Sequence, residues 1–338
     1  MKKIGKTTRS NMITYGIVIV AFVIMQILVS GGYVTNSLSG QLVPICVYVC
    51  MAISLNLTVG ILGELSLGHA GFMSVGAFSG VVLAMSIQNA VPAIAGVVVG
   101  VPVLRLQGDY LAIVTLAFGE IIKNVLNNLY VGVDGSGLHF SMKSTDALGM
   151  VDGKVLINGP MGVGGIQKLS TFSSGVVLIL ITLFLVLNLI HSRTGRAIMA
   201  VRDNKIAAES IGLSVTRYKL LAFVISAVFA GMAGTLYAMN FSTVTASKFD
   251  FNTSILILVF VVLGGLGNIW GSIIAAALLT VLPELLRSMN DYRMLIYAIL
   301  LIVMMIFNNS GAKKRLTEYF SAQKEKRTAK KAAGKGVN

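Results

Sequence analysis

The chain alternates between long apolar runs and short polar interruptions. A helix needs roughly twenty mostly apolar residues to cross a bilayer. By that measure the sequence predicts about ten membrane-spanning helices, at residues 12–30, 41–62, 70–87, 90–105, 109–129, 172–191, 217–240, 251–265, 271–288 and 292–308. The third and fourth are short and rich in glycine and proline, which favours short or broken helices. The expected fold class is all-α, a polytopic membrane helix bundle.

Glycine is frequent inside the apolar runs, as in GHAGFMSVGAFSG and FAGMAGTL. Small residues three or four positions apart allow membrane helices to approach closely, so these runs predict a packed bundle. Two glycine-rich stretches, GILGELSLGHAGF and VLGGLGNIWGSI, faintly resemble each other. Such pairs mark the inverted repeats of ion-coupled transporters. Their places in the span order do not correspond under a five-plus-five repeat, which makes that class less favoured.

The charge distribution gives the expected orientation. Only 12% of the residues are charged, against about 25% in soluble domains, and 55% are hydrophobic. Nineteen of the 27 Lys and Arg residues fall in three short segments: the first nine positions, Arg193 to Lys219, and Lys313 to Lys335. A nucleic-acid-binding protein more often spreads its positive charge over a folded polar face. Basic clusters beside apolar runs instead indicate cytoplasmic loops, so we expect lipid as a partner and no nucleic acid.

This orientation divides the chain into regions. We expect a cytoplasmic basic tail at 1–11, a transmembrane permease domain at 12–310, and a second cytoplasmic basic tail, disordered, at 311–338. Within the domain, 193–216 forms a cytoplasmic loop and 130–171 an extracellular one. The extracellular loop is rich in Gly, Asp and Ser, which predicts turns rather than another span. Both termini are expected in the cytoplasm, and the protein in the cell membrane.

Several kinds of chemistry are missing from the sequence. No GxxxxGK[ST], HExxH or GxSxG motif occurs, so we expect no ATP hydrolysis, no metal site and no cofactor on this chain. Cys46 and Cys50 lie four apart in an apolar run and are expected to be buried thiols. The few ionisable groups at membrane depth are mostly near span ends, which makes a membrane-embedded enzyme unfavoured: Glu64, Asp109, Glu120, Lys123 and Glu284.

The cytoplasmic loop carries a helical pattern of its own. In NKIAAESIGLSV, Asn204 is placed to cap the start of a short helix, and Gly212 to end it in a left-handed turn. The resulting helix has small and apolar residues between basic flanks. It suits lying across the membrane face and inserting into the cleft of a partner protein. The alternative is an amphipathic helix resting on lipid.

This loop resembles the coupling loop of ABC-transporter permeases, whose motif is Glu-Ala-Ala, three residues, then Gly. Ala207, Ala208 and Gly212 match, whereas Ile206 replaces the Glu and the nearest acid is Glu209. The stretches LNLTVGILGELSLGHAGFMSVGAF, LRLQGDYLAIVTLAFGEIIKNVL, TGRAIMAVRDNKIAAESIGLSVTRYKLLAFVISAVFAGMAGTLYA and LILVFVVLGGLGNIWGSIIAAALL look like the branched-chain amino-acid ABC permease family, its LivM branch more than its LivH branch. The resemblance covers most of residues 40–308, and the Glu-less loop is how that family usually writes the motif.

The resemblance implies an importer assembled from several chains. A second, homologous permease subunit would pair with this one, two cytoplasmic ABC ATPase subunits would bind ATP and Mg²⁺, and an extracellular binding protein would deliver the solute. Residues of the coupling loop would transmit the ATPase movement: Arg202, Asp203, Asn204, Ala207, Ala208, Glu209 and Gly212. The expected solute is a branched-chain or other hydrophobic amino acid. Urea, short amides or nucleosides remain alternatives within the class, and ion-coupled secondary transport is an alternative outside it.

The scarcity of charge within the spans predicts a weak, mostly apolar solute path. Broken helices can expose backbone dipoles to the amino and carboxylate groups of a solute. Candidates for the path lie in the glycine-rich break and on the polar face of the fifth span: Gly63, Glu64, Ser66, His69, Asp109, Thr115 and Glu120. The alternative is that glycines in the break, Gly63, Gly68 and Gly71, serve only close helix packing. Glu120 and Lys123, three apart, could neutralise each other.

Overall fold

The computed structural model describes residues 6–32, 35–86, 111–134, 137–150, 153–166 and 168–286, with isolated positions between 292 and 306. Asp109, the predicted span 90–105, most of 292–308 and the tail 311–338 lie outside the described residues. The chain divides into two compact units, Met1–Glu284 and Leu285–Asn338. In the second, the described positions are short helical pieces with exposed apolar side chains such as Ile299. The elements and contacts that follow belong to the first.

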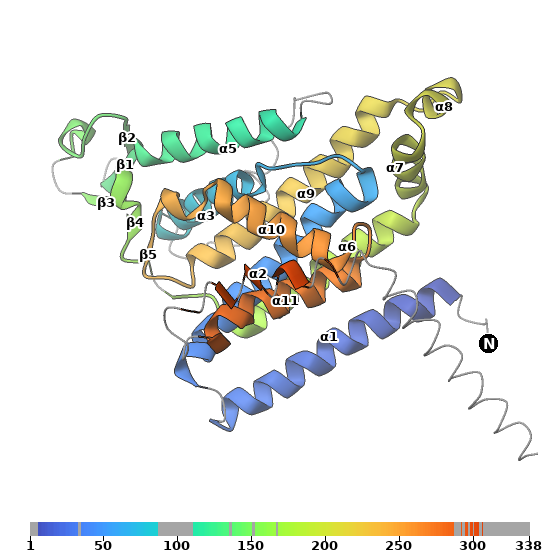
Figure 1. The fold of residues 1–338 in the computed structure, drawn as a ribbon. Helices are drawn as coiled ribbons and strands as arrows, with labels where there is room; N and C mark the ends of the chain where they lie inside the picture. The colour runs from blue at the N-terminus through green and yellow to red at the C-terminus, as the bar shows by residue number, and fades with distance from the viewer. Residues whose placement is uncertain are drawn as a thin grey trace, which may run out of the picture. The chain divides into compact units, whose positions relative to one another are not determined.

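Among the described residues, ten α-helices and a π-helix that continues α2 account for the coupling loop and for the predicted spans that the structure describes (Figure 1). They are α1 (Lys6–Ser30), α2 (Asn36–Asn56) with the π-helix η1 (Leu57–Leu62), α3 (His69–Ser86), α5 (Leu111–Asn127), α6 (Phe172–His191), α7 (Arg193–Asp203), α8 (Lys205–Ser210), α9 (Val215–Ala238), α10 (Phe251–Gly264) and α11 (Ile269–Leu285). Each predicted span outside 90–105 and 292–308 coincides with one of them. Four described segments are long and apolar enough to cross a membrane. The chain is a multi-pass helical membrane protein, and the count of ten spans stays a prediction.

The centre of the bundle is held by close contact between α3 and α9. A Cβ atom added to Gly76 would overlap the backbone of Gly231, and one on Gly234 would overlap the carbonyl of Met73. Such contact lets the two backbones approach, as small residues do in membrane bundles. The predicted role of glycine in close packing is therefore confirmed at this crossing. Cys46 and Cys50 on α2 are buried free thiols, as expected.

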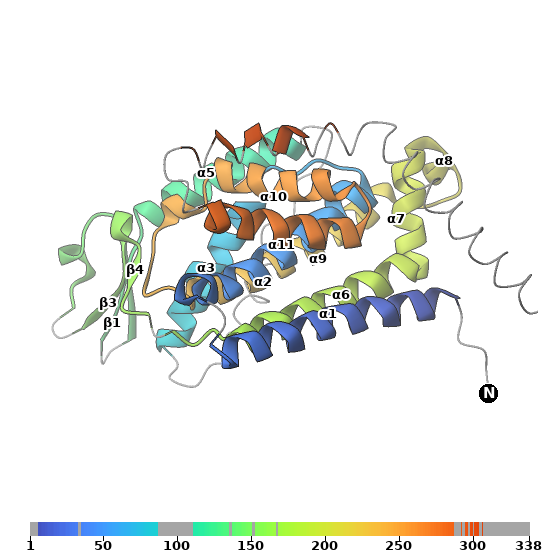
Figure 2. The ribbon, with the colours of Figure 1, turned by 60° about the horizontal axis from the view of Figure 1, so that its bottom comes forward.

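A five-stranded antiparallel sheet lies at one end of the helical bundle (Figures 1 and 2). The fold is therefore mainly helical, and the expectation of an all-α fold missed this sheet. Its strands are β1 (Tyr130–Asp134), β2 (Gly137–Ser141), β3 (Lys154–Asn158), β4 (Val163–Gly164) and β5 (Thr243–Val244), in the order β2-β1-β3-β4-β5. The strands are short and interspersed with turn-forming residues, which is why the composition predicted turns. The last strand comes from the connection between α9 and α10. Pairing of Val163 with Val244 ties the two segments together.

The opposite end carries the charged loop. The first turn of α1, the end of α6, and both α7 and α8 lie at this end, away from the sheet (Figures 1 and 2). The flanks of the bundle expose apolar side chains, including Ile24 and Ile27 on α1 and Phe184 on α6. A water-soluble surface rarely exposes so continuous an apolar face. These flanks suit the hydrocarbon of a membrane.

Candidate coupling and translocation site

A sharp corner directs α7 across the end of the bundle. Ser192 ends α6, and its side-chain oxygen accepts a hydrogen bond from the amide of Gly195 at 3.1 Å. A Cβ atom on Gly195 would overlap the carbonyl of Leu189, so only glycine fits inside the corner. The cap satisfies an amide that the first turn of a helix leaves open. The chain thereby turns from a spanning helix into a short helix at its end.

The helix predicted in the loop is present as α8. The side-chain oxygen of Asn204 accepts a hydrogen bond from the amide of Ala207 at 3.0 Å, which confirms the predicted cap. At the other end Gly212 has a φ of +82°. The amide of Gly212 donates to Glu209 and that of Leu213 donates to Ala208, both at 3.0 Å. This is the Schellman pattern of helix ends, so the predicted left-handed turn is confirmed as well.

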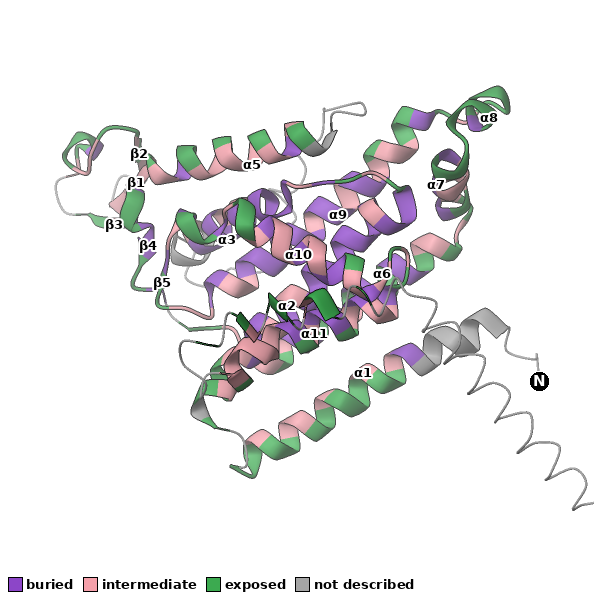
Figure 3. Cartoon of the chain, in the orientation of Figure 1, coloured by how far each residue is buried: buried purple, intermediate pink, exposed green. Residues whose placement is uncertain are grey.

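The two faces of α8 have different surroundings, and not all of its small residues are available to a partner protein. Ala208 is buried, packed in one cluster with Val201 of α7 and Val215 of α9. Ile206 and Ile211 are 80% and 73% exposed. Figure 3 shows that almost the whole outer surface of α8 is exposed. The apolar side chains of α8 that remain available to a partner protein therefore include Ile206, Ala207 and Ile211, whereas Ala208 holds α8 to its own chain.

Arg202 connects this region to the end of α2. Its Nη1 atom donates a hydrogen bond to the carbonyl oxygen of Gly60 at 3.1 Å. Its Nε and Nη2 atoms both lie 2.9 Å from Oδ1 of Asp203, which is mainly exposed. Carbonyls at a helix C-terminus have no partner within the helix, and a basic side chain there is favourable. Arg202 is thus a cap for η1 as well as a member of the predicted coupling loop.

The chain is broken between η1 and α3, as the sequence predicted. Gly63 ends η1 with a φ of +83°, and no helix forms again until His69. The Nε2 atom of His69 lies 2.9 Å from Oγ of Ser54, a residue within α2. The amide of Ala70 donates to Oγ of Ser254 on α10 at 3.1 Å. The segment after Gly63 therefore runs back beside α2, and α3 begins inside the bundle.

Three of the described candidate path residues have side-chain partners within the chain. Glu64 is paired with Lys219 of α9, and Glu120 with Lys123 on its own helix, so the expected neutralisation within α5 is present. Oγ1 of Thr115 accepts a hydrogen bond from the amide of Leu67 at 3.2 Å. The Glu64 and Thr115 contacts join the break to α9 and α5, whereas the Glu120 contact stays within α5. Asp109 lies outside the described residues.

The glycines of the break have different surroundings. A Cβ atom on Gly68 would overlap the carbonyl of Thr115, and one on Gly71 would lie 2.8 Å from Cα of Gly119. Both contacts are with α5, which supports the packing interpretation for these two positions. Gly63 instead has a left-handed backbone with the Arg202 side chain beside it. Among the described residues, the buried atoms Oγ of Ser66 and Nδ1 of His69 have no hydrogen-bond partner. Buried polar groups are seldom left so.

The sequence did not indicate a cavity at the sheet end of the bundle. It has a volume of about 350 Å³ and is lined by Gln41, Pro44, Tyr48, Tyr237, Phe241, Thr243, Val244 and Lys248. These residues come from α2, the end of α9 and the connection that includes β5, so no local motif could have revealed it. Within the described part of the chain, no cluster of three His, Cys, Asp or Glu side chains could hold a metal ion.

The chain is similar to known permease proteins. The family model for the permease component of branched-chain amino acid transport systems matches residues 37–307. The high-affinity branched-chain amino acid transport system permease protein LivM of Salmonella typhimurium is 38% identical over 281 residues, 76% of this chain and 65% of that protein. LivM of Escherichia coli is 37% identical over 282 residues, again 76% and 65%.

A more distant relative is the fructose import permease protein FruG of Bifidobacterium longum, 29% identical over 121 residues, 34% of this chain and 36% of that protein. The match to this chain spans about 65% of the length of the two LivM proteins. No solved structure matches the chain. The family match extends from the start of α2 to beyond α11 and includes the break, the coupling loop and the sheet. The chain belongs to the family of branched-chain amino acid transport system permease components.

Proposed function

We propose that the chain is the transmembrane permease subunit of an ABC importer that translocates branched-chain, or other hydrophobic, amino acids delivered by an extracellular binding protein. The observation that carries the importer assignment is α8, a capped helix that presents Ile206 and Ile211 at the end of the bundle. Two exposed apolar side chains on a fixed helix are typical anchors for a protein groove. The names of the LivM relatives support the solute class.

The proposed assembly places different partners at the two ends. Two ATPase subunits, which bind ATP and Mg²⁺, contact the end with α7 and α8, and a second homologous permease lies alongside in the membrane. The solute-binding protein docks at the end with the sheet. We place the protein in the cell membrane with the α8 end and both termini in the cytoplasm and residues 130–171 outside. The basic residues of the loop and of the start of α1 support this orientation.

Coupling requires that ATPase closure change the contacts of α8 differently in two states, since equal contact in both shifts nothing. Ile206, Ala207 and Ile211 make the contact in this proposal. Asn204 and Gly212 fix the ends of α8, and Glu209 lies on its exposed surface. Arg202, with Asp203, joins the loop to the end of α2. Together these positions form a rigid lever rather than a flexible connector.

The solute path is proposed to use the break and the outer cavity. The cavity combines aromatic walls with the amide of Gln41 and the amine of Lys248, which suits a carboxylate beside an apolar side chain. Ser66 and His69, in the break, carry two of the three buried side-chain atoms that have no hydrogen-bond partner among the described residues. A solute could satisfy these atoms in passing without being held tightly. Glu64, Thr115 and Glu120, whose side chains already have partners, support the walls of the path.

The function can be tested with the reconstituted complex of both permeases, ATPases and binding protein. We expect uptake of leucine, isoleucine and valine that depends on ATP. Ile206→Ser combined with Ile211→Ser should abolish uptake while the complex remains in the membrane, because the partner-facing anchors are lost. Ile27→Ser, at an apolar residue of α1 that is also largely exposed, is the control and should leave uptake intact. Normal uptake by the double variant would refute the coupling role of α8.

The solute and the orientation have separate tests. If the three amino acids neither enter nor compete while urea or a nucleoside does, the solute class is wrong and the permease assignment stands.

For orientation, single cysteines at Ser144, Ser214 and Ser321 would be exposed to a membrane-impermeant thiol reagent in intact cells. Native Cys46 and Cys50 are buried and should stay silent. Labelling at 214 or 321 with none at 144 would contradict the proposed topology.

A further inference from the structure

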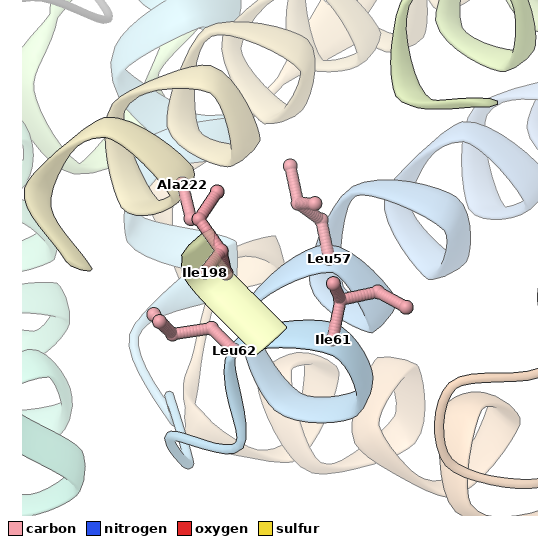
Figure 4. Close-up of a cluster of buried hydrophobic side chains, with 5 residues drawn as sticks. All are labelled: Leu57, Ile61, Leu62, Ile198 and Ala222. Atoms are coloured by element: carbon pink, nitrogen blue, oxygen red, sulfur yellow. The ribbon is translucent and has the colours of Figure 1, made fainter. Parts of the chain in front are cut away.

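A small apolar cluster joins the coupling loop to the end of α2. Leu57, Ile61 and Leu62 of η1 pack against Ile198 of α7 and Ala222 of α9 (Figure 4). Each of these side chains is at most 5% exposed. Tightly packed interiors transmit displacement instead of absorbing it. A movement of α7 therefore reaches η1 directly, through contacts within this chain.

Two polar contacts continue the cluster into the break. Arg202 of α7 donates to the carbonyl oxygen of Gly60, inside η1. Lys219 of α9 is paired with Glu64, the residue after the left-handed Gly63. Both partners of this ion pair are mostly buried, with side chains 22% and 17% exposed. The break is thus tied at its start to α7 and α9, the two helices that flank α8.

Glu64 is held at its backbone as well as at its side chain. Its amide donates to the carbonyl of Thr58 at 3.1 Å and so closes the last turn of η1. Beyond Glu64 the chain continues without regular structure to Ser66 and His69, whose buried Oγ and Nδ1 atoms have no hydrogen-bond partner among the described residues. The ion pair joins the start of this stretch to α9, and Leu67 then contacts Thr115 of α5. The Glu64 carboxylate is therefore a contact through which α9 can displace the residues that follow.

We propose that Glu64 and Lys219 are positioning residues that transmit movement of the coupling segment to the break between η1 and α3. This inference rests on the proposed importer function. When α8 is displaced, α7 and the start of α9 move with it, because Ala208 packs against Val201 and Val215. The ion pair then moves residues 64–69 and changes what Ser66 and His69 present to the solute. Without the pair, α9 moves and the break does not follow.

The test measures uptake and ATP hydrolysis in the same purified, assembled complex. Lys219→Gln and Glu64→Gln should each lower the ratio of solute transported to ATP hydrolysed at least tenfold, while ATP hydrolysis continues. Lys219→Arg, which keeps the charge, should retain most of the ratio. The exchanged pair, Glu64→Lys with Lys219→Glu, should recover at least part of what either single exchange loses. A residue needed only for folding would lower both activities together and leave their ratio unchanged.

Arg217→Gln provides the matched control, since it removes the same charge two residues away on the same helix, and its ratio should be unchanged. An unchanged ratio in Lys219→Gln, or an exchanged pair no better than the single exchanges, overturns the proposal. A ratio lowered equally in Arg217→Gln also overturns it, because general loss of positive charge would then be the cause. Failure of the wild-type complex to transport any amino acid refutes the proposed function instead, and the ratio is then measured with the solute that is transported.

Discussion

The two glycine-rich breaks of the chain are built differently although their sequences resemble each other. After Gly264 the chain reverses locally: Gly265 and Gly267 have φ values of +95° and +78°, and the amide of Asn268 donates to Gly265 at 2.9 Å. A Cβ atom on Gly271 would overlap the carbonyl of Gly264. This second break is a compact corner between α10 and α11. The contact that closes this corner is between backbones only seven positions apart in the sequence.

The first break, at residues 63–69, depends on the rest of the bundle. Glu64 contacts α9, Leu67 contacts α5, and His69 contacts α2. A corner closed by contacts between nearby residues keeps its shape more easily, whereas a stretch held by three separate helices moves when they move. The first break is therefore better suited than the second to respond to movement of α7 and α8. The end of α2 contacts the second break, since Oδ1 of Asn56 accepts a hydrogen bond from the amide of Gly267 and its Nδ2 donates to Ser272.

The largest expected effect is at the compact corner. Gly271→Val should prevent stable folding, because its side chain meets the backbone of Gly264, which cannot move aside as a flexible side chain can. We expect a loss of about 3 kcal/mol or more, at the upper end of overpacking costs. Yield of monodisperse protein and the thermal midpoint in detergent are the measurements. Gly40→Val, with nothing within 4 Å, is the control, and equal behaviour of the two would mean that the corner is not closely packed.

The next largest loss of stability is expected at the contact between Asn56 of α2 and the corner that joins α10 to α11. Asn56→Leu leaves the amide of Gly267 and the hydroxyl of Ser272 without this partner in a buried place. An orphaned buried group costs roughly 1–3 kcal/mol, so the free energy of unfolding should fall by about 2 kcal/mol. Denaturant or thermal unfolding measures the change. Asn128→Leu, whose amide contacts only its own helix at an exposed position, should change little. A larger loss of stability in Asn128→Leu than in Asn56→Leu would show that the Asn56 contacts do not stabilise the fold.

In the first break, at residues 63–69, we expect a smaller loss of stability than in Asn56→Leu but a clear loss of uptake. His69→Gln removes the ring that contacts Ser54 and the unpartnered Nδ1 atom. Loss of one hydrogen bond costs about 1 kcal/mol, so the complex should assemble. Uptake in the reconstituted complex should nevertheless fall several-fold, because the solute path is altered. His191→Gln, near the coupling corner, is the comparison. Uptake that falls only in proportion to assembled protein would place His69 in packing alone.

The smallest effect compares two glycines with the same backbone shape. Gly63 and Gly212 have φ values of +83° and +82°. Alanine at either should cost about 1 kcal/mol from left-handed strain. Gly63→Ala also meets Cγ of Arg202 at 2.6 Å, whereas Gly212 has nothing within 4 Å. We expect Gly63→Ala to be the more destabilising by less than about 1 kcal/mol, since a flexible side chain can shift. A larger cost at Gly212 would contradict the assigned surroundings.

Features with local causes were determined by the sequence itself. Spans follow from the length of apolar runs, and the ends of α8 from Asn204 and Gly212, whose bonds reach residues only a few positions away. Close helix crossing follows from glycine spacing, because a missing side chain allows approach wherever a neighbour lies. The family resemblance rests on the same stretches. These predictions needed no knowledge of which helices are neighbours.

Only the tertiary structure decided which side of each element is used. Ala208 faces inward because Val201 and Val215 happen to meet it, and Glu64 meets a lysine 155 positions away. The sheet is completed by β5, far along the chain from β4. Periodicity gives a helix its faces, but the partner of each face depends on long-range packing. The same glycine pattern therefore became a rigid corner in one place and an open break in the other.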